Sequence, residues 1–105
     1  MHHLKTHEQF QRLLETNQRF IVWFSAAWCG PCQNMNKQEL DDASQEAGVP
    51  LIYCDQTVND ETRQACDIRS FPTFVCFDQG AVVAKRQSAD TAKVCMFIKQ
   101  HKQVF

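Results

Sequence analysis

Residues 20–32 of the chain read FIVWFSAAWCGPC, an apolar run that leads into two cysteines separated by Gly30 and Pro31. The nearly continuous apolar run over residues 20–25 predicts a central β-strand that is covered on both faces. Because proline fits the first turn of a helix without losing a hydrogen bond, Pro31 indicates that a helix begins at the cysteines. Two cysteines with two residues between them, at such a strand-to-helix junction, are typical of a redox dithiol.

The spacing of Cys29 and Cys32 lets their sulfurs meet in a small disulfide ring, and the predicted helix points its free N–H groups at the first sulfur. A helix N-terminus favours negative charge, so we expect Cys29 to be a thiolate more often than an ordinary cysteine. Since thiolates attack disulfides, Cys29 is the predicted nucleophile, exposed at the helix start, and the less exposed Cys32 is the predicted resolving cysteine. The alternative is a pair of structural cysteines or a motif that has lost its activity.

Length and composition favour one small globular domain over residues 1–105. Hydrophobic residues make up 44% of the chain and charged residues 22%, which is ordinary for a soluble protein. The net charge of −1 gives no reason to expect nucleic acid or an anionic membrane as a partner. No apolar run approaches the roughly 20 residues of a membrane span. Residues 1–5 have no apolar signal region, so we expect a cytoplasmic protein.

The chain has six cysteines, and four of them lie outside the predicted dithiol: Cys54, Cys66, Cys76 and Cys95. These four fall in predicted strands and helices, where we expect them to pack as small apolar side chains rather than to form a disulfide framework. A structural zinc site needs a second close pair of ligands, which their wide spacing does not supply, so no metal is predicted. Cys66, before the loop at residues 69–74, is a possible regulatory thiol; the alternative is an inert, partly buried cysteine.

The remaining pattern predicts an alternation of helices and strands that ends in a hairpin and a helix. Strand–helix–strand units imply parallel pairing and the hairpin adds antiparallel pairing, so we expect a mixed sheet with helices on both faces. Strands are predicted over residues 20–25, 51–55, 74–77 and 81–85, with a weak first strand at 3–5, and helices from Thr6 to about Asn17, over 31–47 and 60–67, and from about residues 88–90 onward.

Two segments together resemble the thioredoxin family. Residues 24–32, FSAAWCGPC, are similar to its active-site strand and loop, and residues 69–74, RSFPTF, resemble the loop whose cis-proline faces the dithiol. The order and spacing of the other elements match over nearly the whole chain. The resemblance implies an α/β thioredoxin fold, with a central mixed sheet of four to five strands flanked by helices on both faces.

The resemblance also implies a protein-disulfide reductase that cycles Cys29 and Cys32 between dithiol and disulfide and needs no cofactor. Trp28, Gly30 and Pro31 would form the active-site loop, and the backbone of Phe71, Pro72 and Thr73 would bind an extended substrate segment. Asp55, at the end of a strand, either hydrogen-bonds near Trp28 or caps the turn. The implied partners are client proteins with disulfides and an electron donor, a thioredoxin reductase or a small thiol, and we expect a monomer.

The chain departs from the family pattern at positions that bear on this chemistry. Thioredoxins usually hold a buried aspartate six residues before the first cysteine and a matching lysine on the next strand, where this chain has Trp23 and Leu51. A lone buried charge is costly, so the loss of both is coherent, and we expect slower exchange at neutral pH. Lys37 replaces the proline that kinks the active-site helix, which predicts a straighter helix. Ser70 and Ser88 replace glycines beside the site.

Two alternatives to a general reductase therefore stay open. The chain is then either a specialised exchanger for a single client, or a binding module that the redox state of the dithiol gates.

Overall fold

The computed structural model of the protein describes residues 1–103. None of the helices in this range is long and apolar enough to cross a membrane. The five strands are β1 (His2–His3), β2 (Phe20–Ser25), β3 (Leu51–Asp55), β4 (Thr73–Asp78) and β5 (Ala81–Gln87), and the five helices are α1 (His7–Glu15), α2 (Gly30–Gln33), α3 (Lys37–Ala47), α4 (Asp60–Ala65) and α5 (Thr91–Gln100).

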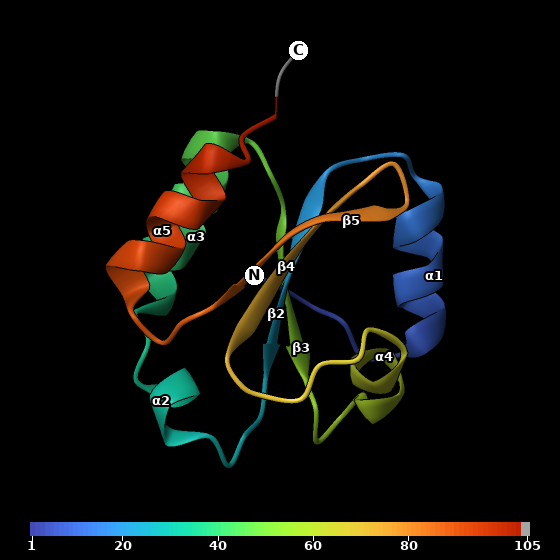
Figure 1. Ribbon diagram of the computed structural model, residues 1–105, viewed down its shortest axis with the longest axis horizontal. Coiled ribbons are helices and arrows are strands. Elements are labelled where there is room, and N and C mark those ends of the chain that lie inside the picture. Colours follow the sequence, from blue (N-terminus) through green and yellow to red (C-terminus); the bar gives the residue numbers. More distant parts are fainter. Residues whose placement is uncertain (104–105) are drawn as a thin grey trace.

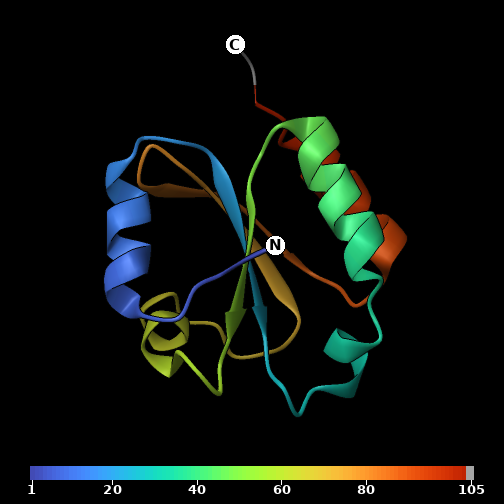
Figure 2. The same cartoon turned by 180° about the vertical axis from the view of Figure 1, so that it is seen from behind.

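The strands form one mixed sheet in the order β1-β3-β2-β4-β5. β1, β3 and β2 run parallel, whereas β4 is antiparallel to both β2 and β5. Helices α3 and α5 cover one face of this sheet and α1 and α4 cover the other (Figure 1). The view from behind shows the N-terminal segment beside β3 (Figure 2). The predicted α/β fold with a mixed sheet of four to five strands is confirmed, and the sheet has five.

Strand β2 is the centre of the fold because all six of its residues are buried. Its side chains alternate between two hydrophobic cores, as the period of a strand requires. Ile21 and Trp23 belong to the core under α3 and α5, and Val22 and Phe24 to the core under α1. Full burial of such a side chain stabilises the fold by roughly 1.5–3 kcal/mol, so β2 holds its carboxyl end, where the cysteines follow, in a fixed place.

The helix predicted over residues 31–47 is in fact two helices, α2 and α3, so that prediction was wrong. Asn34 caps the end of α2, and the side chain of Asn36 caps the start of α3 by accepting a hydrogen bond from the Glu39 N–H. The Asn36 N–H donates to Thr91 Oγ1 at 3.1 Å, which ties the break to the start of α5. The expectation that Lys37 straightens this helix was therefore also wrong, because the break needs no proline.

Other element boundaries shift by a few residues. α1 ends at Glu15 rather than near Asn17, and β5 continues to Gln87. Asp90 is the N-cap of α5, and Gly80 takes a positive φ of 79° in the β4–β5 hairpin, where glycine carries no steric penalty.

Candidate active site

Cys29 and Cys32 form a disulfide at the carboxyl end of β2, with their Cα atoms 5.3 Å apart. Cys29 is the N-cap of α2, and its Sγ accepts a hydrogen bond from the Cys32 N–H at 3.3 Å. Because α2 has only four residues, this local N–H, rather than the dipole of a long helix, is the group that favours a thiolate on Cys29.

The two sulfurs differ less in exposure than predicted. Cys32 is fully buried, as expected, but Cys29 is only 6% exposed in this disulfide form, so its predicted exposure was wrong. The reason is that Phe71 packs against the small cluster formed by Ala26 and the two cysteines. Cys29 is still the more accessible residue of the two.

The loop that follows α4 lies directly against the dithiol. The Phe71–Pro72 peptide bond is cis, as predicted, and the Phe71 carbonyl oxygen lies 3.9 Å from Cys29 Sγ. Pro72 and Thr73 are buried, and Thr73 Oγ1 donates to the Ser70 carbonyl at 2.8 Å. The residues predicted to bind substrate are thus brought beside the residue predicted to attack it.

Trp28 forms an exposed wall beside the dithiol. Its side chain is 67% exposed, its ring meets Phe71 edge-on at 5.7 Å, and its Nε1–H donates to Gln56 Oε1 at 3.1 Å. Gly30 and Pro31 are exposed as well, and a Cβ added at Gly30 would meet nothing within 4 Å. The active-site loop therefore presents an open surface around the dithiol rather than a deep pocket.

Asp55 holds this loop in place and fills both roles that the sequence left open. Its Oδ1 accepts from the Ala27 N–H at 3.2 Å, next to Trp28, and from the Thr57 N–H at 2.9 Å, which caps the turn. Gln56, whose side chain bonds Trp28, was not predicted. A glutamine in a polar turn carries no sequence signal, because only the folded turn brings it to the indole.

The interior on the α3–α5 face of β2 is apolar. Trp23 is fully buried, stacks on Phe74 at 5.4 Å and meets Tyr53 edge-on at 5.0 Å. Its Nε1–H has no hydrogen-bond partner within residues 1–103, and Leu51 belongs to the same core. Trp23 and Leu51, which stand where thioredoxins usually hold a buried aspartate and lysine, are thus part of a hydrophobic cluster in this protein. The hydroxyls of Tyr53 and Ser25 form a buried hydrogen bond of 3.1 Å nearby.

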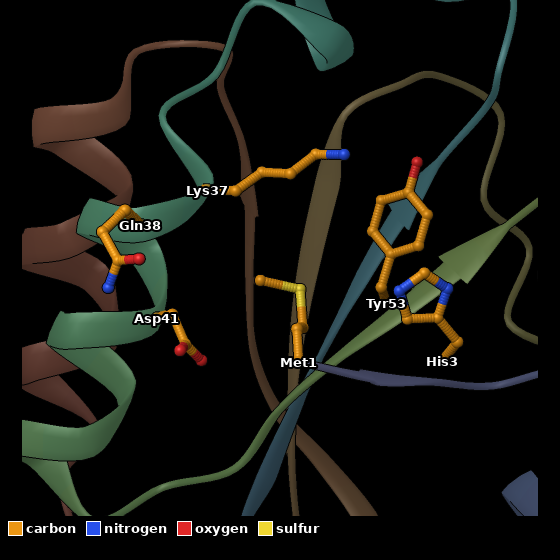
Figure 3. A pocket seen from close by; sticks show the side chains of 6 residues that line it. All are labelled: Met1, His3, Lys37, Gln38, Asp41 and Tyr53. Atoms are coloured by element: carbon orange, nitrogen blue, oxygen red, sulfur yellow. The ribbon is translucent and has the colours of Figure 1, made fainter.

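A separate cavity of about 210 Å³ lies beside the start of α3 (Figure 3). The Lys37 side chain reaches across it, with Nζ 5.5 Å from the centroid of the Tyr53 ring, and the His3 ring packs on the same tyrosine at 5.1 Å. Neither cysteine of the dithiol lines this cavity. Among residues 1–103 there is also no group of three or more metal-ligating side chains.

The other four cysteines are free thiols, of which Cys54 and Cys76 are buried and Cys66 and Cys95 are partly exposed. Burial is the main cause that raises the pKa of Cys54 to about 12 and the pKa values of Cys66 and Cys76 to about 11, and it also raises the pKa of Cys95. Cys66 is half-buried against the core under α1. Its raised pKa makes it a slow nucleophile near neutral pH, and its predicted regulatory role stays a prediction.

Comparison with known proteins identifies the family to which the chain is similar. A family model described as Thioredoxin matches residues 1–100. A thioredoxin of Geodia cydonium is 31% identical over 102 residues, which cover 94% of this chain and 96% of that protein. A mitochondrial thioredoxin-3 of Saccharomyces cerevisiae is 27% identical over 77 residues, which cover 73% of this chain and 61% of that protein.

The fold comparison agrees with the sequence comparison. The X-ray structure of a thioredoxin from Fasciola hepatica matches with a TM-score of 0.85 and 28% identity, and the match covers 97% of this chain and 100% of that one. The chain therefore belongs to the thioredoxin family, and with its Cys29–Cys32 pair it is a thiol–disulfide oxidoreductase that reduces protein disulfides.

Proposed function

We propose that Cys29 is the attacking thiol and Cys32 the resolving thiol of this reductase. The observation that carries the assignment is the N-cap geometry of α2, in which Cys29 Sγ accepts the Cys32 N–H. A hydrogen bond to sulfur stabilises the charged form, so it lowers the cost of forming the Cys29 thiolate. Cys32 is fully buried, which suits a thiol that reacts only with its neighbour.

In the reaction, the Cys29 thiolate attacks one sulfur of a client disulfide, and the other client sulfur leaves as a thiolate that takes up a proton. This step joins Cys29 to the client. The Cys32 thiol then loses its proton and attacks Cys29 Sγ, which releases the second client thiol and closes the Cys29–Cys32 disulfide. Two electrons have passed to the client. A reductase or a small thiol supplies two electrons and two protons to restore the dithiol.

The client segment lies between the exposed Trp28 ring and the cis-proline loop. An extended segment there pairs with the backbone on either side of Pro72, because that loop borders Cys29 and recognition through the backbone tolerates different side chains. We further propose that the protein acts as a monomer in the cytoplasm. Size-exclusion chromatography with light scattering tests the first statement, and fractionation with a mitochondrial marker tests the second.

Reduction of insulin by dithiothreitol tests the proposed roles. The native chain accelerates the reaction, and Cys29→Ser lowers the rate to that of dithiothreitol alone. Cys95→Ser is the matched control, since that half-exposed thiol lies on α5, and it keeps the native rate. Acceleration that survives in Cys29→Ser overturns the assignment.

No acceleration by the native chain points to one of the two alternatives. Mixed-disulfide trapping with Cys32→Ser then separates them. A single trapped client indicates a specialised exchanger. A partner that still binds when Cys29 is absent indicates a redox-gated binding module, and in that case the general-reductase proposal is wrong.

A further inference from the structure

A groove runs between the edge strand β5 and helix α5, beginning at the active-site end of the sheet. Its volume is about 290 Å³ and it is lined by Arg86, Lys93, Met96, Phe97 and Gln100. Within residues 1–103, α5 packs mainly on α3 and makes few contacts with β5, which leaves space between the strand and the helix. Figure 1 shows β5 running into the lower end of α5, beside α2.

The floor of this groove is apolar and adaptable. Phe97 is buried at its base, whereas Met96 is 61% exposed, which is unusual for a large apolar side chain. Methionine is flexible and polarizable, so it accommodates different apolar partners. Among the described residues, no strand pairs with the outer edge of β5, which leaves room for an extended chain along the groove.

The rim of the groove is positively charged. Neither the Arg86 guanidinium nor the Lys93 ammonium forms an ion pair or a side-chain hydrogen bond within residues 1–103, and no acidic side chain lines the groove. By contrast, Lys99 on the opposite side of α5 pairs with Glu46 at 3.4 Å. The two rim cations are therefore available to carboxylates of a partner.

The groove lies within reach of the dithiol. Arg86 pairs with Phe74, two residues after Pro72, and Cys29 Sγ lies beside the Phe71 carbonyl. With a rise of about 3.3 Å per residue and about 4.8 Å between strands, Arg86 lies about 8 Å from Pro72. The 3.9 Å between the Phe71 carbonyl oxygen and Cys29 Sγ brings the span from Arg86 to the dithiol to about 12 Å. An extended client segment covers this span with about four residues.

We infer that the β5–α5 groove is a second docking site for client proteins, specific for a segment that carries acidic and apolar side chains about four residues from the disulfide. Carboxylates pair with Arg86 and Lys93, and an apolar side chain packs on Met96. This inference rests on the proposed reductase function and names the class of client that the same dithiol prefers.

Two synthetic peptides test the inference. Each holds one cysteine as a mixed disulfide with 5-thio-2-nitrobenzoate and a leucine three residues away, with charged residues at the fourth and fifth positions on both sides. The charged residues are aspartate and glutamate in one peptide and lysine in the other. Attack by Cys29 on the peptide sulfur joins the peptide to Cys29 and releases the coloured thiolate, so the absorbance reports the second-order rate constant.

We expect the pre-reduced protein to react about tenfold faster with the acidic peptide than with the basic one, because paired rim charges act mainly on the association rate. The double variant Arg86→Glu/Lys93→Glu removes or reverses this preference. Lys5→Glu/Lys102→Glu changes the net charge equally at exposed lysines that form no ion pair within the described residues and lie outside the groove, and it keeps most of the preference.

Equal rates for both peptides with the native protein overturn the docking site while leaving the reductase function intact. An equal loss of preference in the control variant assigns the effect to net charge and also overturns it. Release of the coloured thiolate from neither peptide contradicts the reductase function itself, and the docking inference fails with it.

Discussion

The six cysteines of this protein occupy two kinds of position, and they differ in what each sulfur bonds. Cys29 lies where β2 has ended and α2 begins, and its Sγ accepts an N–H. Cys54 and Cys95 do the opposite, since their sulfurs lie 3.8 and 3.6 Å from the Asn59 and Glu39 carbonyls, to which the thiols donate. An accepted hydrogen bond favours a thiolate and a donated one favours a thiol.

This comparison indicates that the backbone groups around a cysteine, rather than a polar interior, determine how readily its thiol ionises and reacts. The core that contains Trp23 is as apolar as the surroundings of the free thiols, and Cys76 belongs to that same core. What distinguishes the dithiol is the end of a strand, an N-cap and an open loop.

The largest effect is expected from Trp23→Asp, which tests whether the interior near the dithiol is truly apolar. Loss of a buried indole costs about 3–5 kcal/mol, and the new carboxylate finds no charged partner there, so we expect destabilisation of at least about 4 kcal/mol in urea unfolding. Trp28→Asp is the matched control, because that indole is 67% exposed, and it costs under about 1 kcal/mol.

The same variant tests the expected slow exchange of the native chain. In the Trp23→Asp protein that remains folded, the carboxylate accepts the Cys32 proton, so resolution of a mixed disulfide speeds up. An unchanged resolution rate contradicts the idea that the missing carboxylate slows the native reaction. A stability loss below about 1 kcal/mol contradicts the apolar interior.

An intermediate effect is expected from alkaline pH, which tests the free thiols. Burial raises the pKa of Cys54 from 9.0 to about 12, so between these pH values the thiol ionises in the unfolded chain but not in the folded one. The stabilisation is complete below pH 9 and is lost as the pH rises towards 12. Urea unfolding at increasing pH measures this loss.

The matched variant for that series is Cys54→Ala, which loses less stability than the native chain over the same pH range. In Cys95→Ala, at a less buried thiol, the free energy of unfolding depends on pH almost as it does in the native chain. If the free energy of unfolding of the native chain and of Cys54→Ala depend on pH in the same way, the difference between the two kinds of cysteine does not come from burial.

The smallest effect is expected from Asp55→Ala, which tests the polar support of the loop. The change leaves the Ala27 and Thr57 N–H groups without their acceptor, and we expect a loss of about 1–2 kcal/mol. We also expect insulin reduction to slow a few-fold, because the loop that carries Trp28 loosens. Asp55→Asn keeps an oxygen acceptor, so we expect it to retain most of the native stability and most of the native rate of insulin reduction. Equal losses in the two variants contradict the hydrogen-bonding role.

Much of the fold was predictable from the sequence because its strands are marked by apolar runs. The break between α2 and α3 was missed because residues 34–36 contain neither Gly nor Pro. The signal that marks it is Asn36 with Glu39 three residues later, the pattern of a helix N-cap.

The reactive residues of the site were also predictable, whereas the residues that hold the active-site loop in place were not. Cys29, Cys32 and Pro72 stand in short motifs whose spacing carries the prediction. The contacts of Asp55, Gln56 and Phe71 with the loop depend on how β3 and the cis-proline loop fold against it, which no local pattern encodes. For the same reason the low exposure of Cys29 in the disulfide was not foreseen.

Site-resolved alkylation of the reduced protein tests the central claim most directly. Iodoacetamide is added at pH 7 and the modification of each of the six cysteines is followed by mass spectrometry. The account predicts that Cys29 reacts at least about 100-fold faster than Cys54, Cys66 and Cys76, since their raised pKa values leave almost no thiolate. Reaction of Cys66 or Cys76 as fast as that of Cys29 would contradict it.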